Sequence, residues 1–192
     1  MAHRVFFSFH YQDVIDFRAN VVRNHWVTKE DREDAGFFDA SIWETAKRTS
    51  PLAVKRLINK ELQNTSVTVV LIGSESYSRR WVRYEIIKSM WKGNKILGVH
   101  INGIEDKDQK KKGLGRNPFD FLGYQYSEDG TKLYPYEKKN GKWVEYGDYD
   151  PYTLKTTVSP SNRGKFFKLS SKHQVYDWIG DKGYDNFSTW VG

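Results

Sequence analysis

The chain has 192 residues, of which 38% are hydrophobic and 16% aromatic, so it carries enough apolar surface to fold and is not a disordered protein. It contains no cysteine, which excludes a disulfide scaffold, a thiol enzyme and a cysteine-ligated metal site. The net charge of +7 is spread along the chain, as on the surface of an ordinary domain.

The N-terminal segment predicts a strand followed by a helix. Residues 4–9 form an apolar, aromatic run, and Asp13 is a good N-cap for a helix that fades near Trp26. No apolar leader precedes the strand, and no stretch approaches the roughly 20 apolar residues of a membrane span. We therefore expect a cytoplasmic protein without membrane contact.

The next segment predicts a short second strand and a second helix. Residues 29–34 are charged and predict a connector, and residues 36–39 predict a brief strand that ends in a carboxylate. A polar loop is expected to follow through Ser41 and Trp43. A capping serine, a proline and apolar residues at helical spacing then predict a helix over residues 50–62.

Two strongly apolar runs predict central strands with a helix between them. Residues 66–72 and 95–101 are rich in aliphatic side chains, and residues 79–92 carry apolar side chains at helical spacing. The alternation predicts an α/β fold with a central, mostly parallel five-stranded sheet flanked by helices. Because such sheets bind ligands at their carboxyl ends, we expect a pocket beside the loops after Phe9, Asp39 and Ile72.

The last part of the chain departs from this pattern. Residues 102–123 begin with a polar, lysine-rich stretch that predicts a mobile loop, and residues 124–146 contain two turn signals between aromatic runs, which predict an antiparallel hairpin insertion. Residues 165–169 predict the last strand of the sheet, followed by a helix that Ser170 and Ser171 cap and that carries Trp178. We therefore expect a single domain over residues 1–192, composed of a core over 1–101, a loop over 102–123, a hairpin insertion over 124–146 and a last strand with a C-terminal helix over 165–192.

Several common catalytic motifs are missing from the sequence. It contains no phosphate-binding P-loop, no dinucleotide fingerprint after the first strand, no H-E-x-x-H and no G-x-S-x-G. Its five histidines are scattered without metal-ligand spacing, so we expect no metal site.

Glu85 is the strongest candidate for chemistry. It lies one helical turn after Trp81 and borders the apolar row formed by Val82, Ile86 and Met90. A carboxylate there would be partly desolvated, with an indole available for a ligand ring. The alternative is an ordinary ion pair with one of the arginines at positions 79, 80 and 83, which helical periodicity by itself favours.

These segments, in this order and spacing, resemble a TIR domain. The resemblance is carried by residues 4–9 with Asp13, by Phe38 and Asp39, by residues 66–73 and by residues 78–85, which include a W-x-x-x-E-type motif. Residues 117–124 and 175–178 extend it over essentially the whole chain to the ThsB family, the TIR-like proteins of the bacterial Thoeris anti-phage defence system. The fold implied is the flavodoxin-like fold of TIR domains.

The resemblance also implies an activity. It implies a protein that consumes NAD as its substrate, without a further cofactor, by cleaving the bond between nicotinamide and ribose. It implies that the product is a cyclic ADP-ribose isomer, made when a phage-derived trigger is sensed, which activates a second Thoeris protein, an NADase.

The resemblance assigns roles to particular residues. Glu85 matches the catalytic glutamate of the family, and Trp81 lies on the pocket side of the same helix. Phe9 and His10 match the aromatic and polar positions at the end of the first strand, and the remaining substrate-contact candidates at this rim are Ser8 and Asp39. Tyrosine and arginine are frequent in the family where this chain has Phe9 and His10, and cysteine often follows the tryptophan.

Two other functions remain open at this point. Many TIR domains are interaction scaffolds in which the pocket is idle, and fold alone does not confer activity. Nucleic-acid binding through the arginines near Glu85 and residues 110–112 is disfavoured, because acidic residues are interspersed among them. We expect no nucleic-acid partner, and the aromatic insertion over 124–146 is our candidate for trigger sensing or self-association.

Overall fold

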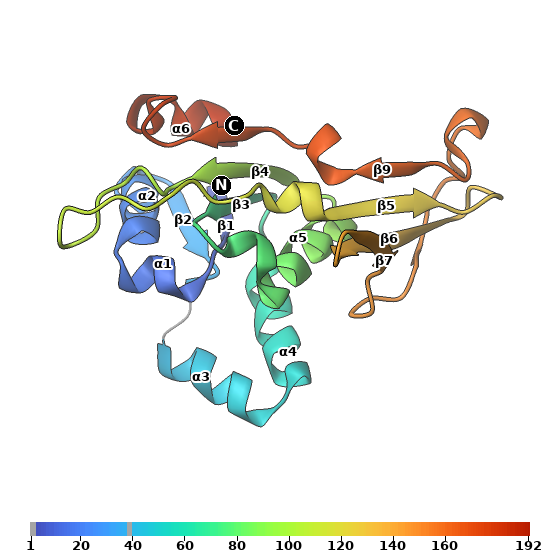
Figure 1. The fold of residues 1–192 in the computed structure, drawn as a ribbon, viewed down its shortest axis with the longest axis horizontal. Helices are drawn as coiled ribbons and strands as arrows, with labels where there is room; N and C mark the ends of the chain where they lie inside the picture. The colour runs from blue at the N-terminus through green and yellow to red at the C-terminus, as the bar shows by residue number, and fades with distance from the viewer. Residues whose placement is uncertain (1–2, 38–39) are drawn as a thin grey trace.

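The computed structural model describes residues 3–37 and 40–192, and its centre is a five-stranded parallel sheet. The strand order is β10-β4-β3-β1-β2, so the first strand lies between the third and the second (Figure 1). The strands are β1 (His3–Ser8), β2 (Arg32–Ala35), β3 (Val67–Ile72), β4 (Lys95–His100) and β10 (Val175–Asp177). The predicted α/β fold with a parallel five-stranded sheet is confirmed.

Helices cover both faces of this sheet. They are α1 (Tyr11–Ile15), α2 (Arg18–Val27), α3 (Ala40–Thr49), α4 (Pro51–Leu62), α5 (Arg80–Lys92) and α6 (Gly183–Val191). Side chains of α2 and α6 share one hydrophobic cluster with β1, β3 and β4, and side chains of α4 and α5 pack in two further clusters that include Phe6 and Val70 from the sheet. None of the helices in the described part of the chain is both long and apolar enough to cross a membrane.

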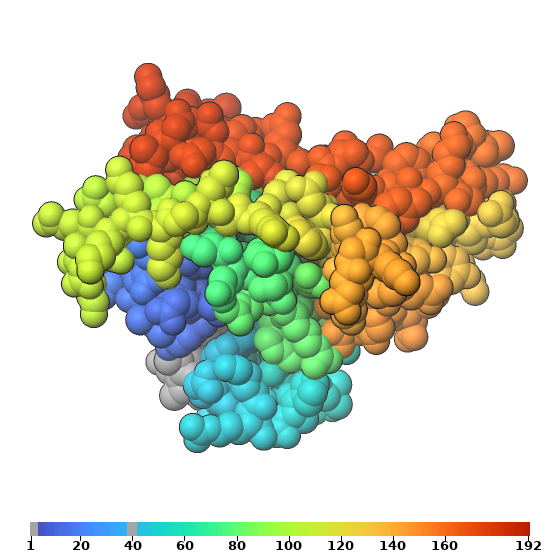
Figure 2. Space-filling view, viewed as in Figure 1, coloured from blue at the N-terminus to red at the C-terminus, as the bar shows by residue number. Residues whose placement is uncertain are grey.

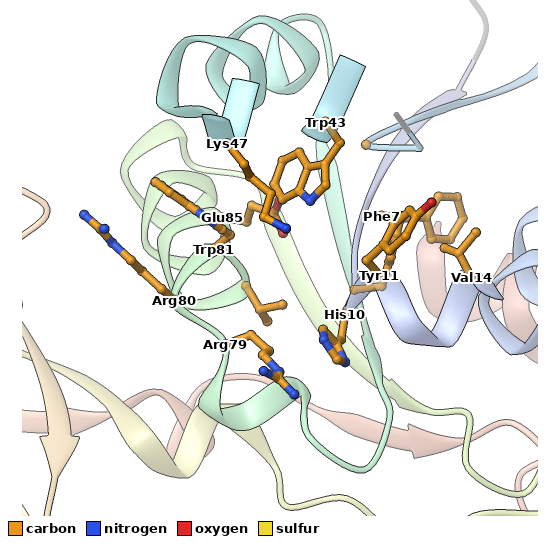
Figure 3. A pocket seen from close by; sticks show the side chains of 13 residues that line it. Phe7, His10, Tyr11, Val14, Trp43, Lys47, Arg79, Arg80, Trp81 and Glu85 are labelled. Atoms are coloured by element: carbon orange, nitrogen blue, oxygen red, sulfur yellow. The ribbon is translucent and has the colours of Figure 1, made fainter. Parts of the chain in front are cut away.

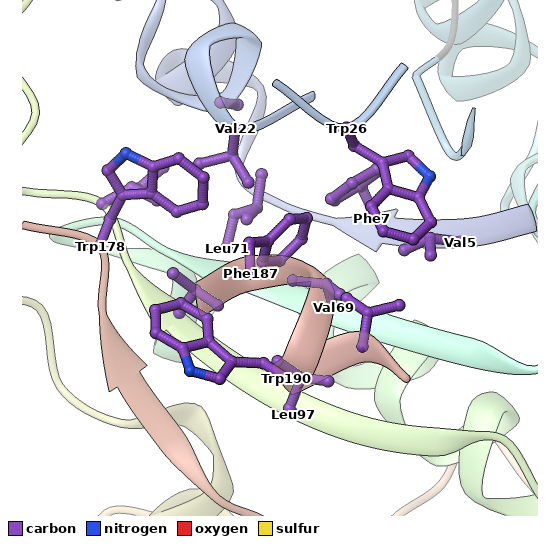
Figure 4. Close-up of a cluster of buried hydrophobic side chains, with 14 of the residues drawn as sticks. Val5, Phe7, Val22, Trp26, Val69, Leu71, Leu97, Trp178, Phe187 and Trp190 are labelled. Atoms are coloured by element: carbon purple, nitrogen blue, oxygen red, sulfur yellow. The ribbon is translucent and has the colours of Figure 1, made fainter. Parts of the chain in front are cut away.

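Large aromatic side chains fill the cluster beneath α2 and α6. Trp26, Trp178 and Phe187 are completely buried, and the ring of Phe187 meets both indoles edge to face at 5.7 and 5.4 Å (Figure 4). All six residues of β3 are buried, as expected for a central strand with helices on both faces.

A second, antiparallel sheet follows the first four parallel strands and lies to one side of them (Figure 1). It has the order β7-β6-β5-β9, with β8 (Tyr152–Thr153) paired to β6. Its main strands are β5 (Leu122–Tyr126), β6 (Lys132–Lys139), β7 (Lys142–Glu145) and β9 (Phe166–Lys168). An antiparallel sheet is present as predicted, but it extends beyond the predicted residues 124–146 to include β8 and β9. Asn140 and Gly141 form its second turn, both with positive φ.

The C-terminal part of the chain differs from the prediction. The strand predicted at residues 165–169 exists as β9, but it pairs with β5 of the antiparallel sheet. The sequence does not distinguish the two sheets here, because a short aromatic strand has the same pattern in either one. The helix predicted from Ser170 is wrong: residues 169–171 form a single 3-10 turn, and Val175–Asp177 is β10, which pairs with Gly98–His100. The C-terminal helix begins only at Gly183, where a Cβ atom would lie 2.4 Å from the Trp178 ring.

The N-terminal part also departs from the prediction in its boundaries. The single helix expected after Asp13 is divided into α1 and α2 by Phe17, whose φ of 64° is left-handed. The second strand lies at Arg32–Ala35 and overlaps the charged connector predicted at residues 29–34, because it is an edge strand with one half-exposed face. The polar loop expected through Trp43 belongs to α3, and Phe38 and Asp39 lie outside the described residues.

The lysine-rich segment after β4 is held against the core and does not form the free loop that we expected. Arg18 of α2 is completely buried, and its guanidinium donates to the carbonyl oxygens of Ile104 and Lys110 at 2.9 and 2.6 Å and pairs with Asp106 at 3.0 Å. Figure 2 shows this segment, in yellow-green, lying over the N-terminal helices in blue. The sequence predicts a loop correctly, but its anchor is a residue 86 positions away from Ile104.

Candidate active site

A cavity of about 240 Å³ lies at the carboxyl end of β1, between α1, α3 and α5 (Figure 3). The segments after β1 and β3 and the segment after β2 all contribute to its wall, as the rule for parallel sheets predicts. Four of the six residues predicted as catalytic or substrate-contact residues line it: Phe9, His10, Trp81 and Glu85.

The Glu85 carboxyl is buried in the wall of this cavity. α5 packs its apolar side against the sheet, which turns Glu85 inward, and the residue is only 5% exposed. Ser8 Oγ, at the end of β1, donates a hydrogen bond of 2.5 Å to Glu85 Oε2. Ser8 itself is fully buried, so it supports the carboxyl from below and does not line the cavity.

The neighbouring arginines pair with other acids. Arg79 pairs with Glu75, Arg80 with Asp148 at 2.7 Å, and Arg83 with Glu137 at 2.6 Å. The alternative prediction, an ion pair between Glu85 and one of these arginines, is therefore wrong. The glutamate accepts a hydrogen bond from a serine hydroxyl in a poorly hydrated cavity wall. A buried carboxyl of this kind is typical of a catalytic site and not of a surface ion pair.

Burial controls the charge of Glu85. It raises the pKa of the carboxyl to about 8, against the opposite effect of the Ser8 hydrogen bond, which favours the charged form. In the free protein at neutral pH the carboxyl is therefore mostly protonated. A cationic ligand beside it would lower this pKa and favour the carboxylate, because opposite charges within a few ångströms stabilise each other.

Two indoles flank Glu85. Figure 3 shows Trp81 of α5 and Trp43 of α3 on either side of it, both on the wall of the cavity. The Trp81 ring is held from behind by the Arg80 guanidinium, 4.8 Å from its centroid, and edge to face by Tyr84 at 5.9 Å. A flat aromatic or cationic ring could stack on either indole while remaining close to the carboxyl.

Phe9 and His10 form the wall at the end of β1. The Phe9 ring packs on the Phe37 ring with centroids 4.4 Å apart, which fixes its position in the cavity wall. Burial lowers the pKa of His10 to about 4, and the nearby cations Arg79, Lys112 and Lys47 contribute, against the opposite effect of Asp16. The imidazole is therefore neutral at physiological pH.

The second sheet is attached to the helix that carries Glu85. Asp148 accepts two hydrogen bonds from Arg80, at 2.9 and 2.7 Å, and also pairs with Lys55 of α4. The Tyr149 ring stacks on Tyr84 at 4.6 Å. Together with the buried pair of Arg83 and Glu137, these contacts fix the first two turns of α5.

The sequence missed part of the cavity. Trp43 and Lys47 line it, and we had placed the segment around Trp43 in a loop. The spacing of Ile42, Trp43 and Ala46 is helical and could have revealed α3. Asp39 was predicted to lie at the same rim, and its position falls outside the residues that the structure describes.

Comparison with known proteins gives two findings. Residues 6–106 match the model of the family described as Thoeris protein ThsB, TIR-like domain. The whole chain is 63% identical, over 191 residues and the full length of both proteins, to a protein of Bacillus cereus (strain MSX-D12) named "Putative cyclic ADP-D-ribose synthase ThsB1".

Proposed function

The chain belongs to the ThsB family of Thoeris TIR-like proteins, and from that membership we propose that it cleaves NAD at the nicotinamide-ribose bond and makes a cyclic ADP-ribose isomer as a defence signal. The observation that carries the proposal at the level of this chain is the position of Glu85. Its carboxyl is buried in the wall of a cavity, held by Ser8 and flanked by two indoles.

The chemistry requires only one carboxylate. The nicotinamide of NAD is a cationic ring that leaves as a neutral molecule, taking the electron pair of the broken bond, so no acid needs to protonate it. What must be stabilised is the positive charge that develops on the ribose carbon. Glu85 supplies a negative charge there, and in a poorly hydrated site such an interaction contributes on the order of several kcal/mol.

The protonation of Glu85 couples this chemistry to substrate binding. The free carboxyl has a pKa of about 8 and is mostly neutral, which avoids an unpaired buried charge in the resting protein. The pyridinium ring of NAD, stacked on Trp81 or Trp43, brings the positive charge that favours ionisation. The carboxylate is thus formed mainly when the substrate that needs it is present.

Formation of a ring requires that water be excluded. A hydroxyl of the adenosine ribose, held against the ribosyl cation by the walls of the cavity, has an effective concentration high enough to compete with solvent. The product is then cyclic, and nicotinamide is released in equal amount.

The signalling role has two further partners. In the proposal the cyclic product activates a second Thoeris protein, an NADase, and a phage-derived component switches synthesis on. The antiparallel sheet is the candidate receiver for that component, because Asp148 and Glu137 connect it to α5.

The experiment is nucleotide chromatography of NAD incubated with the purified chain, with lysate of phage-infected cells and with lysate of uninfected cells, each lysate alone serving as the blank. We expect nicotinamide and a cyclic ADP-ribose isomer to accumulate when the protein is triggered. The absence of both products under every condition would favour a non-catalytic TIR scaffold.

A further inference from the structure

His10 occupies a fixed position in the cavity that holds Glu85. It follows β1 directly and precedes α1, and its carbonyl oxygen accepts a hydrogen bond of 2.9 Å from the Asp13 amide. The end of the strand and the start of the helix therefore hold its backbone on both sides. In Figure 3 its imidazole lies at the end of the cavity away from the two indoles.

The surroundings of His10 keep its imidazole uncharged. Three cations from three different segments act on it: Arg79 before α5, Lys112 of the segment after β4, and Lys47 of α3. Asp16, between α1 and α2, is the acid that opposes them. A neutral imidazole has one nitrogen with a free lone pair, so it can accept a hydrogen bond and then a proton.

We propose that His10 accepts the proton of the ribose hydroxyl that closes the ring, and so determines that the product is cyclic and not linear. This inference rests on the proposed function and deepens it. The hydroxyl oxygen forms a bond to the ribose carbon, the bond from that carbon to nicotinamide breaks with its electron pair on the departing ring nitrogen, and the hydroxyl proton moves to the imidazole and then to solvent.

The geometry separates the two tasks. Glu85 and the indoles lie where the cationic ring would stack, and His10 lies at the other end of the same cavity, where a second sugar of the dinucleotide can reach. A hydrogen bond to the imidazole aligns the hydroxyl before bond formation. A reactant positioned in this way competes with water through its high effective concentration. The pyrophosphate of the bound dinucleotide would offset the nearby cations and raise the pKa of His10, which makes it a better proton acceptor in the complex.

The test is the ratio of cyclic to linear product in the His10→Gln variant, measured with the full chain, isotopically labelled NAD and lysate of phage-infected cells. The matched control is His100→Gln. His100 is another histidine whose pKa burial lowers, but it lies at the end of β4 and does not line the cavity. Thermal unfolding checks that both variants fold.

We expect His10→Gln to lower the cyclic-to-linear ratio by about tenfold or more, because general bases typically contribute factors of 10² or above to the step they serve. His10 also lines the binding cavity, so total nicotinamide release should fall as well, but by a smaller factor than the cyclic product. His100→Gln should leave the ratio unchanged. Added imidazole should restore the cyclic product in His10→Ala.

Three results would overturn the inference. An unchanged ratio in His10→Gln would show that the imidazole does not direct the ring closure. Equal loss of cyclic product and nicotinamide would place His10 in bond cleavage instead. Absence of nicotinamide release in the wild-type protein under every condition would contradict the proposed function itself. The wild-type measurement separates this result from the two results on the His10 variant.

Discussion

Ser8 Oγ lies 2.5 Å from Glu85 Oε2, and this contact joins the end of β1 to the middle of α5 across 77 positions of sequence. It places a hydroxyl donor on the one carboxyl that lines the cavity among the residues the structure describes. Two opposing effects therefore set the ionisation of Glu85: burial, which favours the neutral form, and the hydrogen bond, which favours the charged form.

Ser8→Ala should reduce nicotinamide release by roughly five- to tenfold at pH 7, because this factor corresponds to the net free energy of about one hydrogen bond. Loss of the donor raises the pKa of Glu85 further, so the acidic limb of the pH profile of kcat/KM should move to higher pH. The control is Ser89→Ala on the same helix, which removes the acceptor of a buried hydrogen bond of 2.8 Å that Thr68 Oγ1 of β3 donates. A limb that moves equally in both variants would contradict the role of Ser8.

Glu85→Gln should make the protein more stable at neutral and alkaline pH. The folded-state pKa of about 8 lies above the value of 4.5 for an unperturbed glutamate, so the folded protein binds more protons than the unfolded chain between these values. Wild-type stability therefore falls as pH rises through this window. Above it the variant should gain on the order of a few kcal/mol. Urea unfolding at pH 5, 7 and 9 measures this, and parallel curves for the two proteins would argue against a buried neutral carboxyl.

Arg83 and Glu137 form a buried pair between α5 and β6, and removal of one partner should cost more than removal of both. A single substitution of such a pair typically costs about 3–5 kcal/mol, whereas an apolar replacement of both is often nearly neutral. Glu137→Leu should cost more than Arg83→Met, because Lys139 still pairs with Glu137 after loss of the arginine, at 2.5 Å. A double-mutant cycle in urea measures the coupling, and additive costs would contradict it.

Arg18→Lys should release the segment after β4. Lysine cannot replace the fork that reaches the carbonyl oxygens of Ile104 and Lys110, so we expect a loss of about 2–4 kcal/mol and faster amide exchange in residues 104–112. Arg23→Lys is the matched control, since its pair with Asp34 is partly exposed and should cost below about 1 kcal/mol. Unchanged exchange in the Arg18 variant would show that the segment is held by other contacts.

The parts of the fold that sequence predicts well are those with strong local patterns. β3 and β4 are nearly continuous apolar runs and α5 has a clear periodicity, so both strands and the helix were predicted within one residue or so of their observed bounds. β2 was misplaced because an edge strand carries charged residues, as a connector does. β10 was missed because its three residues gain their structure from pairing with β4.

The candidate site follows the same division. The motif that contains Trp81 and Glu85 is local, lies on one helix and places both residues on the cavity wall. The partners Glu137 and Asp148 were not predictable, because Glu137 lies on β6 and Asp148 on the segment between β7 and β8, and both meet α5 only through tertiary packing. The position of Trp43 on the cavity wall was not predicted, because this part of α3 was assigned to a loop from the sequence.

The most direct measurement of the central claim is nicotinamide release by Glu85→Gln, a substitution that preserves size and can still accept the hydrogen bond from Ser8. With the protein folded and triggered, we expect release from NAD to fall by about a hundredfold or more, because the variant lacks the negative charge that stabilises the ribosyl cation. Release at the wild-type rate from a correctly folded Glu85→Gln protein would contradict the assignment of Glu85 as the catalytic carboxylate.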